Sequence, residues 1–113
     1  MELEIDLTVE NGIQYFKVTG EIDAYTAPSL KERLESVQDE IGIQVELDLS
    51  GVSYMDSTGL GVFVGFYKRV TASEGHMKIT GLNARLKRLF EITGLDEVME
   101  IESEKGGTQN ATI

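Results

Sequence analysis

The chain of 113 residues has no cysteine, no tryptophan, one proline and one histidine. Without cysteine there is no disulfide, no thiolate nucleophile and no cysteine-bound zinc, which fits a reducing compartment. No apolar run approaches the roughly 18 residues that a membrane span needs, and no basic, apolar leader opens the sequence. We therefore expect a cytoplasmic protein that does not enter a membrane.

Basic residues are also scarce, since 10 Lys and Arg stand against 20 Asp and Glu, for a formal net charge of −10. This charge repels phosphate backbones and anionic lipid, so direct binding to nucleic acid or to a membrane surface is disfavoured. A protein partner should instead present basic groups, although acidity that only keeps a protein soluble is the commoner situation. The length fits one domain with a single core.

Hydrophobic periodicity predicts an alternation of strands and helices. Apolar and polar residues alternate from Leu3 to Val9, and Asn11-Gly12 then supplies the positive-φ residues of a tight hairpin turn. Further strands are predicted at residues 13–19, 43–50 and 77–80, with an edge strand at residues 98–101. Helices are predicted at residues 27–41, 58–72 and 84–93; Pro28 enters the first, Gly42 ends it, Asn83 caps the third and Gly94 ends it.

A hairpin followed by helix–strand crossovers predicts an α/β fold with a small mixed sheet. The alternating first and third strands should have one solvent-exposed face, which places the helices mainly on the other face. The helix at residues 58–72 is apolar around most of its circumference and is expected to be largely buried, with Gly61 and Gly65 letting it lie close to the sheet. We expect one domain at residues 1–102 and a flexible polar tail at residues 103–113.

The stretch from Asp48 to Gly61 is the most informative, because it runs from a strand through a polar turn into this apolar helix. It places two hydroxyls, Ser57 and Thr58, at the helix start, where another protein can modify them. Phosphate on Ser57 would add about −1.5 to −2 charge. The free N–H groups of the helix would stabilise it, while Asp56 would repel it. The alternative is that the two hydroxyls merely cap the helix.

The residue pattern also raises three other kinds of site. Gly59 and Gly61 begin a helix after a strand, but neither the G-x-G-x-x-G nor the Walker pattern is complete, so a nucleotide site is weakly indicated. A serine hydrolase would need His76 within hydrogen-bond distance of Ser57. Four acids near predicted strand ends could gather around Mg²⁺, although scattered loop acids are commoner. They are Glu21, Asp23, Asp48 and Asp56. Local salt bridges are expected for three basic residues of the third helix, which are Arg85, Lys87 and Arg88.

Several motifs, in order along the chain, closely resemble the STAS domain of bacterial anti-sigma factor antagonists. They are Gly20-Glu21-Ile22-Asp23 with Pro28 five residues on, Asp48-Leu49-Ser50-Gly51-Val52, Met55-Asp56-Ser57-Thr58-Gly59-Leu60-Gly61 and Phe90-Glu91-Ile92-Thr93-Gly94-Leu95. The resemblance spans residues 2–102. Within the family, it is strongest to the stress-response antagonists of Bacillus-type partner-switching systems.

The resemblance implies a transcription regulator that is not an enzyme and has no catalytic residue, cofactor or metal. Its unphosphorylated form would bind an anti-sigma factor that is also a serine kinase and so release a sigma factor. The kinase would use Mg-ATP to phosphorylate Ser57, which abolishes binding, and a PP2C-type phosphatase would reverse the change. The implied partner-contact residues are Asp23, Asp56, Ser57, Thr58, Gly59 and Gly61.

The resemblance also favours a chain that is a monomer when free. Three alternatives stay open at this point: a stand-alone STAS scaffold, a small-ligand-sensing subunit and a weak nucleotide hydrolase. The choice between Ser57 and Thr58 as the modified hydroxyl is open as well.

Overall fold

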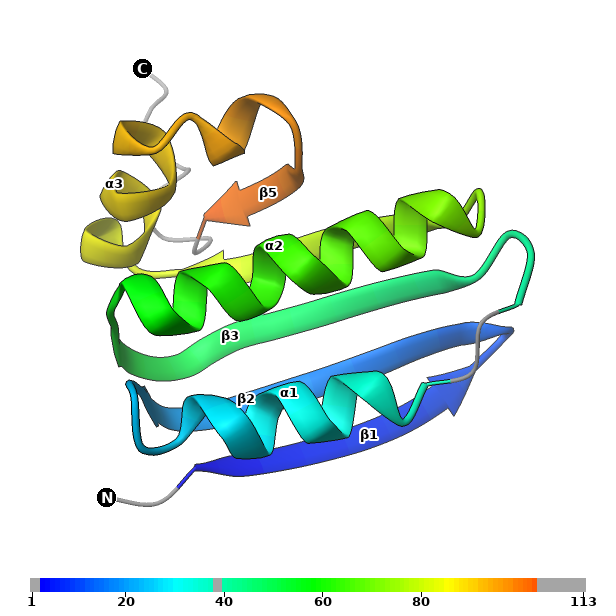
Figure 1. Cartoon of the computed structure of the whole chain (residues 1–113), viewed down its shortest axis with the longest axis horizontal. Helices are drawn as coiled ribbons and strands as arrows, with labels where there is room; N and C mark the ends of the chain where they lie inside the picture. Colours follow the sequence, from blue (N-terminus) through cyan, green and yellow to red (C-terminus); the bar gives the residue numbers. More distant parts are fainter. Residues whose placement is uncertain (1–2, 38–39, 104–113) are drawn as a thin grey trace.

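The computed structural model describes residues 3–37 and 40–103, which form a five-stranded sheet with helices packed against it (Figure 1). The elements along the chain are β1 (Glu4–Glu10), β2 (Ile13–Ile22), α1 (Ala27–Glu35), β3 (Gln44–Met55), α2 (Ser57–Ala72), β4 (His76–Leu82), α3 (Ala84–Ile92), a 3-10 helix η1 (Leu95–Glu97) and β5 (Glu100–Ser103). The strand order in the sheet is β1-β2-β3-β4-β5. β1 and β2 are antiparallel, and the other neighbouring pairs are parallel. This confirms the predicted α/β fold with a mixed sheet. The tail predicted from residue 103 lies almost wholly outside the described residues.

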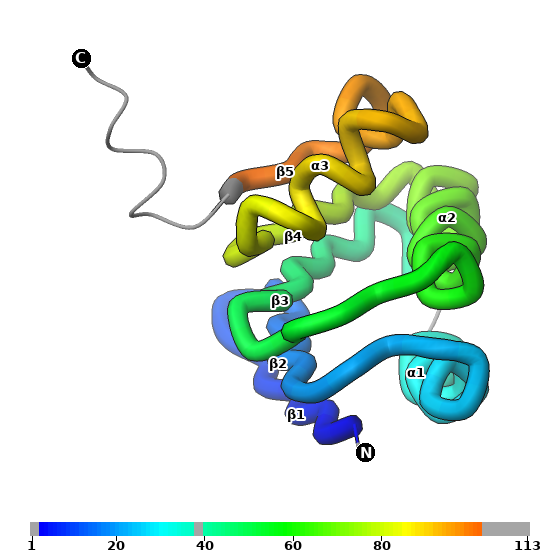
Figure 2. Tube along the Cα trace, turned by 90° about the vertical axis from the view of Figure 1, so that its left-hand side faces the viewer, coloured from blue at the N-terminus to red at the C-terminus, as the bar shows by residue number. Residues whose placement is uncertain are grey.

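Helices α1 and α2 lie side by side over one face of the sheet, as Figure 2 shows. α3 lies towards the β4–β5 edge, at the end of the sheet where α2 begins (Figure 1). The central strands bury alternate apolar side chains on the helix face, among them Phe16, Val18, Val45, Leu47 and Ile79. The residues between these, such as Lys17 and Asp48, lie on the opposite, solvent-exposed face. The predicted placement of the helices mainly on one face is confirmed.

The hairpin turn is also confirmed, because Asn11 and Gly12 have φ angles of 51° and 80°. β1 is less buried than its alternating pattern suggests. Leu7 lies opposite Phe16 on the helix face but is 41% exposed, and Val9 is 60% exposed. β1 is an edge strand, and only the part of it nearest α1 is covered: the guanidinium of Arg33 on α1 donates a hydrogen bond to its Ile5 carbonyl.

Both central strands are longer than predicted. β2 continues to Ile22, where the sequence suggested an exit from the sheet at Gly20. β3 continues to Met55, where a polar turn was expected after Ser50. A single residue therefore separates β3 from α2, and the start of α2 is held directly against the end of the sheet.

The strand ends predicted near Gly20 and Gly51 are wrong because these glycines lie where the pairing of β2 and β3 is irregular. The β2–β3 ladder shifts register near Thr19 and Gly20. A Cβ on Gly51 would lie 2.7 Å from Thr19 Oγ1, so Gly51 is needed where the two strands approach closely. The strands thus pass through these positions without ending.

α1 ends at Glu35, whereas the predicted helix continued to Ile41. Ile41 is 82% exposed and belongs to no apolar helix face. The end of α1 is bound from the neighbouring helix, because the Arg69 guanidinium of α2 donates to Leu34 O in the last turn at 3.1 Å and to Val37 O just after the helix. Arg69 thereby ties the two helices together.

α2 has the predicted extent but not the predicted burial. Its buried positions all lie on the side facing the sheet; they are Gly59, Leu60, Phe63, Phe66 and Val70. Gly61 and Gly65 are exposed, and a Cβ on either would have no neighbour within 4 Å. The expectation that these two glycines bring α2 close to the sheet is wrong. None of the described helices is long and apolar enough to cross a membrane.

The later elements are confirmed with shifted ends. β4 extends beyond the predicted residues 77–80 at both ends. Asn83 caps α3 by accepting a hydrogen bond from Leu86 N at 2.9 Å, and Gly94 adopts the left-handed conformation after the helix, with φ 76°. The predicted edge strand begins at Glu100 and pairs with β4.

Candidate functional site

The parallel pairing of β2 and β3 brings two predicted site residues to one edge of the sheet. Ile22 and Met55, the last residues of these parallel strands, are register partners. Asp23 and Asp56 follow them directly, and Asp56 N donates a hydrogen bond to Ile22 O at 3.2 Å. The loop after β2 and the start of α2 therefore form one continuous surface.

Asp56 is the N-cap residue of α2. Its backbone is extended, and its Oδ1 accepts hydrogen bonds from Thr58 N at 3.0 Å and from Gly59 N at 3.2 Å. The carboxylate also stands at the positive end of the helix dipole, where a negative charge is stabilising. The N–H groups that the sequence suggested for a phosphate are therefore not free, because Asp56 already occupies two of them.

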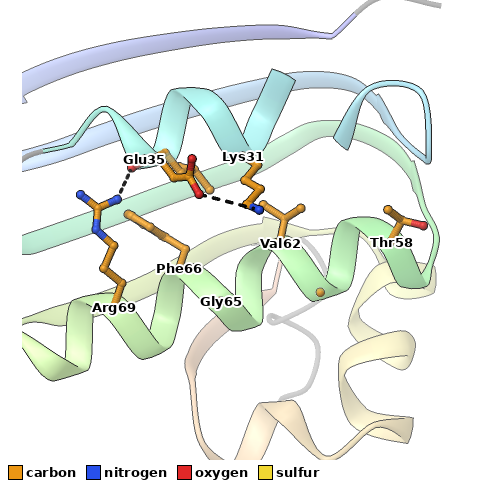
Figure 3. Close-up of a pocket in the computed structure, with 9 residues that line it drawn as sticks. Lys31, Glu35, Thr58, Val62, Gly65, Phe66 and Arg69 are labelled. Atoms are coloured by element: carbon orange, nitrogen blue, oxygen red, sulfur yellow. Dashed lines mark hydrogen bonds and ion pairs between the residues drawn. The ribbon is translucent and has the colours of Figure 1, made fainter. Parts of the chain in front are cut away.

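The hydroxyls of Ser57 and Thr58 do not cap the helix. Both residues are exposed, and in the described part of the chain neither side chain makes a hydrogen bond. The capping alternative is therefore wrong. The two hydroxyls differ in their surroundings, since Thr58 lines a hollow between α1 and α2 whereas Ser57 does not (Figure 3).

Asp23 holds the loop between β2 and α1 in shape. Its Oδ1 accepts hydrogen bonds from Tyr25 N at 2.9 Å and from Thr26 N at 3.0 Å. Thr26 Oγ1 donates to Glu21 O at 2.7 Å and accepts from Asp23 N at 2.9 Å. The pKa of Asp23 lies below its ordinary value. The hydrogen bond from Thr26 N lowers it most, and the hydrogen bond from Tyr25 N has the next largest lowering effect.

This loop contains two residues that the sequence reasoning missed. Thr26 is buried and completes the hydrogen-bonded loop, and Tyr25 projects beside it with 90% of its surface exposed. The Asp23-x-x-Thr26 spacing just before Pro28 is a local signal that would have indicated Thr26, since an Asp and a Thr three residues apart commonly exchange hydrogen bonds with the backbone at a helix entry. No comparable signal marks Tyr25.

Gly59 fixes the first turn of α2 against β2. A Cβ at this position would overlap Cγ2 of Ile22 and lie 3.0 Å from Cγ of Met55. Gly59 is therefore required for packing, and its N–H already binds Asp56, so it does not form a phosphate-binding loop. Gly61, in contrast to Gly59, is exposed on the surface of α2.

The arrangements needed for a hydrolase or a magnesium site are absent from residues 3–37 and 40–103. His76 begins β4 and is a register partner of Gln44, at the amino end of β3, whereas Ser57 follows the other end. The Nε2 atom of His76 lies 2.5 Å from Glu100 Oε1. No three His, Asp or Glu side chains in these residues are grouped to hold a metal ion.

Asp48 illustrates why the four predicted acids do not gather. It lies on the open face of the sheet, 3.5 Å from the ammonium of Lys17. Partial burial opposes its ionisation, but hydrogen bonds from Ser50 and the charge of Lys17 outweigh this and hold the pKa of Asp48 below its ordinary value. Asp23 and Asp56, in contrast, are turned to backbone N–H groups.

The basic residues of α3 behave differently from the expectation. Lys87 lies 3.9 Å from Glu91, one turn along the helix. Arg85 and Arg88 are exposed and have no ion pair within the described residues, so the predicted local salt bridges are wrong for these two.

Similarity to known protein families identifies the family of this chain. The family model described as STAS domain matches residues 4–106. The chain belongs to the STAS domain family. This STAS domain is 55% identical over 89 residues to a Listeria monocytogenes protein named anti-sigma-B factor antagonist, covering 79% of this chain and 78% of that protein. A Bacillus subtilis protein of the same name is 45% identical over 111 residues, covering 96% and 100%.

Solved structures agree on the fold. The crystal structure of an anti-sigma factor antagonist from Mycobacterium paratuberculosis superimposes with a TM-score of 0.79 at 23% identity, covering 97% of this STAS domain and 93% of that chain. At this level of identity the similarity concerns the fold alone. The resemblance noted in the motifs is thus confirmed over nearly the whole described chain.

Proposed function

We propose that this STAS domain is an anti-sigma factor antagonist of a stress-response partner-switching system, controlled by phosphorylation of Ser57. Relatives named anti-sigma-B factor antagonist, at 42% to 55% identity, support the first part. The observation that carries the second part is the state of Ser57. Its hydroxyl is exposed, makes no hydrogen bond within the described residues and stands beside a carboxylate on a firmly held helix start.

The proposed switch is electrostatic. An anti-sigma factor would bind the surface made by the loop at Asp23 and the first turn of α2, with the bare Ser57 hydroxyl inside the contact. Phosphate at this point puts a dianion next to the Asp56 carboxylate. Burying a charge without a partner costs several kcal/mol. A cost of 3 to 5 kcal/mol corresponds to roughly 10²- to 10³-fold or more in affinity.

The proposed contact residues have different tasks. Asp23 and Asp56 hold the loop and the helix start through their backbone hydrogen bonds, and Gly59 lets α2 sit on Ile22. Ser57, Thr58 and Gly61 are the exposed members that a partner would touch.

The partner would be both anti-sigma factor and serine kinase, with Mg-ATP as phosphate donor, and a PP2C-type phosphatase would restore the hydroxyl. In this scheme the STAS domain is a monomer when free, acts in the cytoplasm and performs no catalysis itself.

Binding and phosphorylation by the anti-sigma factor of the same organism test this proposal. Wild type and Ser57→Ala should bind it, and with Mg-ATP only wild type should incorporate phosphate. Ser57→Asp should fold but bind at least about tenfold more weakly, since one charge imitates phosphate in part. Thr8→Asp is the matched control, because it adds the same charge at an exposed position of β1 outside the proposed contact, and it should bind like wild type.

Two results would contradict the assignment. Continued phosphate incorporation in Ser57→Ala would move the modification to Thr58 or elsewhere. Equal affinity of wild type, Ser57→Asp and the enzymatically phosphorylated protein would show that charge at this helix start does not control binding.

A further inference from the structure

A hollow of about 370 Å³ runs between α1 and α2, beginning at the proposed contact surface (Figure 3). Thr58 lines one end of it and Arg69 lines the other. Apolar side chains come from both helices, namely Leu34 of α1 with Val62 and Phe66 of α2. The hollow is thus a mainly apolar groove that is continuous with the exposed surface beside Ser57.

Two glycines keep this groove open. Gly61 and Gly65 are four residues apart on α2, so they lie on one face of the helix, and both line the hollow. Glycine weakens an exposed helix interior relative to alanine. Neither glycine has an internal packing reason, because a Cβ on either would meet nothing within 4 Å. Gly59 differs, since Ile22 fills the space in front of it.

The walls of the groove are held at a fixed separation. Arg69 on α2 donates hydrogen bonds to the carbonyl of Leu34 in the last turn of α1, drawn as a dashed line in Figure 3, and to that of Val37 just after the helix. Lys31 and Glu35 of α1 form an exposed pair at 3.9 Å above the groove. Such a pair is weak and can exchange partners. The groove is therefore preformed, with adaptable charges on its rim.

We infer that this groove receives an apolar side chain of the anti-sigma factor, as a second contact beyond Ser57. The inference rests on the proposed function, and it adds Val62, Gly65 and Phe66 to the binding surface. Three observations point to this occupant: the groove continues the proposed contact through Thr58, its interior is apolar, and its two glycines have no role inside the chain. Protein interfaces draw much of their affinity from a few apolar side chains seated in such pockets.

Filling the groove tests the inference. Gly65→Leu places a side chain in the hollow, and Gly65→Ala leaves most of it open. The affinity of unphosphorylated Gly65→Leu for the anti-sigma factor should be about ten- to a hundredfold lower than that of wild type. This is the loss expected when one apolar side chain of the partner can no longer be buried in the groove. Gly65→Ala should bind within about threefold of wild type. Ala72→Leu is the matched control, because Ala72 is exposed on α2 but does not line the groove.

Val62→Thr gives a second test if Gly65→Leu does not fold, since it keeps the shape of the side chain and adds a hydroxyl to the apolar wall. It should weaken binding by about tenfold. Wild-type affinity in both Gly65→Leu and Val62→Thr, with weak binding by Ser57→Asp, would overturn the groove contact and leave the switch intact. Equal affinity of wild type, Ser57→Asp and the enzymatically phosphorylated protein would instead contradict the proposed switch at Ser57. Circular dichroism and thermal unfolding confirm that each variant is folded.

Discussion

Gly59 in the first turn of α2 lies so close to Ile22, the last residue of β2, that a methyl group on its Cα would overlap the isoleucine side chain. This contact joins two segments that are far apart in the sequence. It fixes the first turn of α2, and with it Ser57, relative to the loop that Asp23 holds. The packing of the fold therefore positions Ser57 relative to this loop in the absence of a partner.

Alanine at the two kinds of glycine in α2 should have opposite effects. Gly59→Ala should lower the free energy of unfolding by about 1 to 3 kcal/mol, because the added methyl overpacks the contact with Ile22. Gly65→Ala should raise it by about 0.5 to 1 kcal/mol, because the site has room and alanine is the better helix former. Urea unfolding of both variants measures the difference. A Gly59→Ala variant as stable as wild type would contradict the close packing.

The Asp56 cap should be separable from its charge. Asp56→Ala should lower the free energy of unfolding by about 1 kcal/mol, because the Thr58 and Gly59 N–H groups lose their acceptor. Asp56→Asn keeps an acceptor and should lose only a few tenths of a kcal/mol. Equal destabilisation by the two substitutions, measured by urea unfolding, would show that the charge rather than the hydrogen bonds stabilises the helix start.

The lowered pKa of Asp23 sets the pH range of its contribution to stability. The carboxylate is favoured in the folded state, so its contribution is fully present above the unfolded pKa, near 3.8, and is lost as the pH falls through the lower folded-state pKa. The difference in unfolding free energy between wild type and Asp23→Asn should therefore be constant from pH 7 to about pH 5 and shrink below about pH 4. A ¹³C NMR titration of the Asp23 carboxyl group measures the pKa directly. A value at or above 3.8 would contradict the hydrogen-bonded loop.

Local rules predicted the elements whose signals lie within a few residues. The hairpin at Asn11-Gly12 and the cap at Asn83 each depend on one turn or one side chain, and both are present as expected. The length of β3 could not be obtained in this way, because Gly51 resembles a strand end but serves a close approach to Thr19 in another strand. Such contacts between strands leave no pattern in the local sequence.

The helix faces show the same limit. Ile41 has the spacing of the α1 apolar face, yet the helix ends at Glu35, where its carbonyls meet Arg69 from α2. Gly61 and Gly65 suggested close packing, but the direction in which they point depends on how α2 is rotated against the sheet. Asp23 and Asp56 follow register partners at one edge of the sheet, because parallel strands bring their carboxyl ends together, whereas Asp48 lies on the open face beside Lys17.

The position of Asp56 leads to a prediction about phosphorylated Ser57 itself. A phosphate at a helix N-terminus is normally held by free N–H groups and by the helix dipole. Here two of these groups already bind Asp56, so phosphate adds repulsion without those hydrogen bonds. Phosphoserine encoded at position 57 should therefore lower the thermal stability of the free protein.

Asp56→Asn should relieve this effect, because it removes the neighbouring charge and keeps the cap. A pair of unit charges about 4 Å apart in water interacts by about 1 kcal/mol, so phosphorylation should cost the asparagine variant about 1 kcal/mol less than wild type. The gap should narrow in 1 M salt, since exposed charges are screened. Thermal unfolding of the four proteins, with and without phosphate, measures it. An equal shift in both backgrounds would mean that phosphate draws away from Asp56, and that repulsion between the two groups does not contribute to the switch.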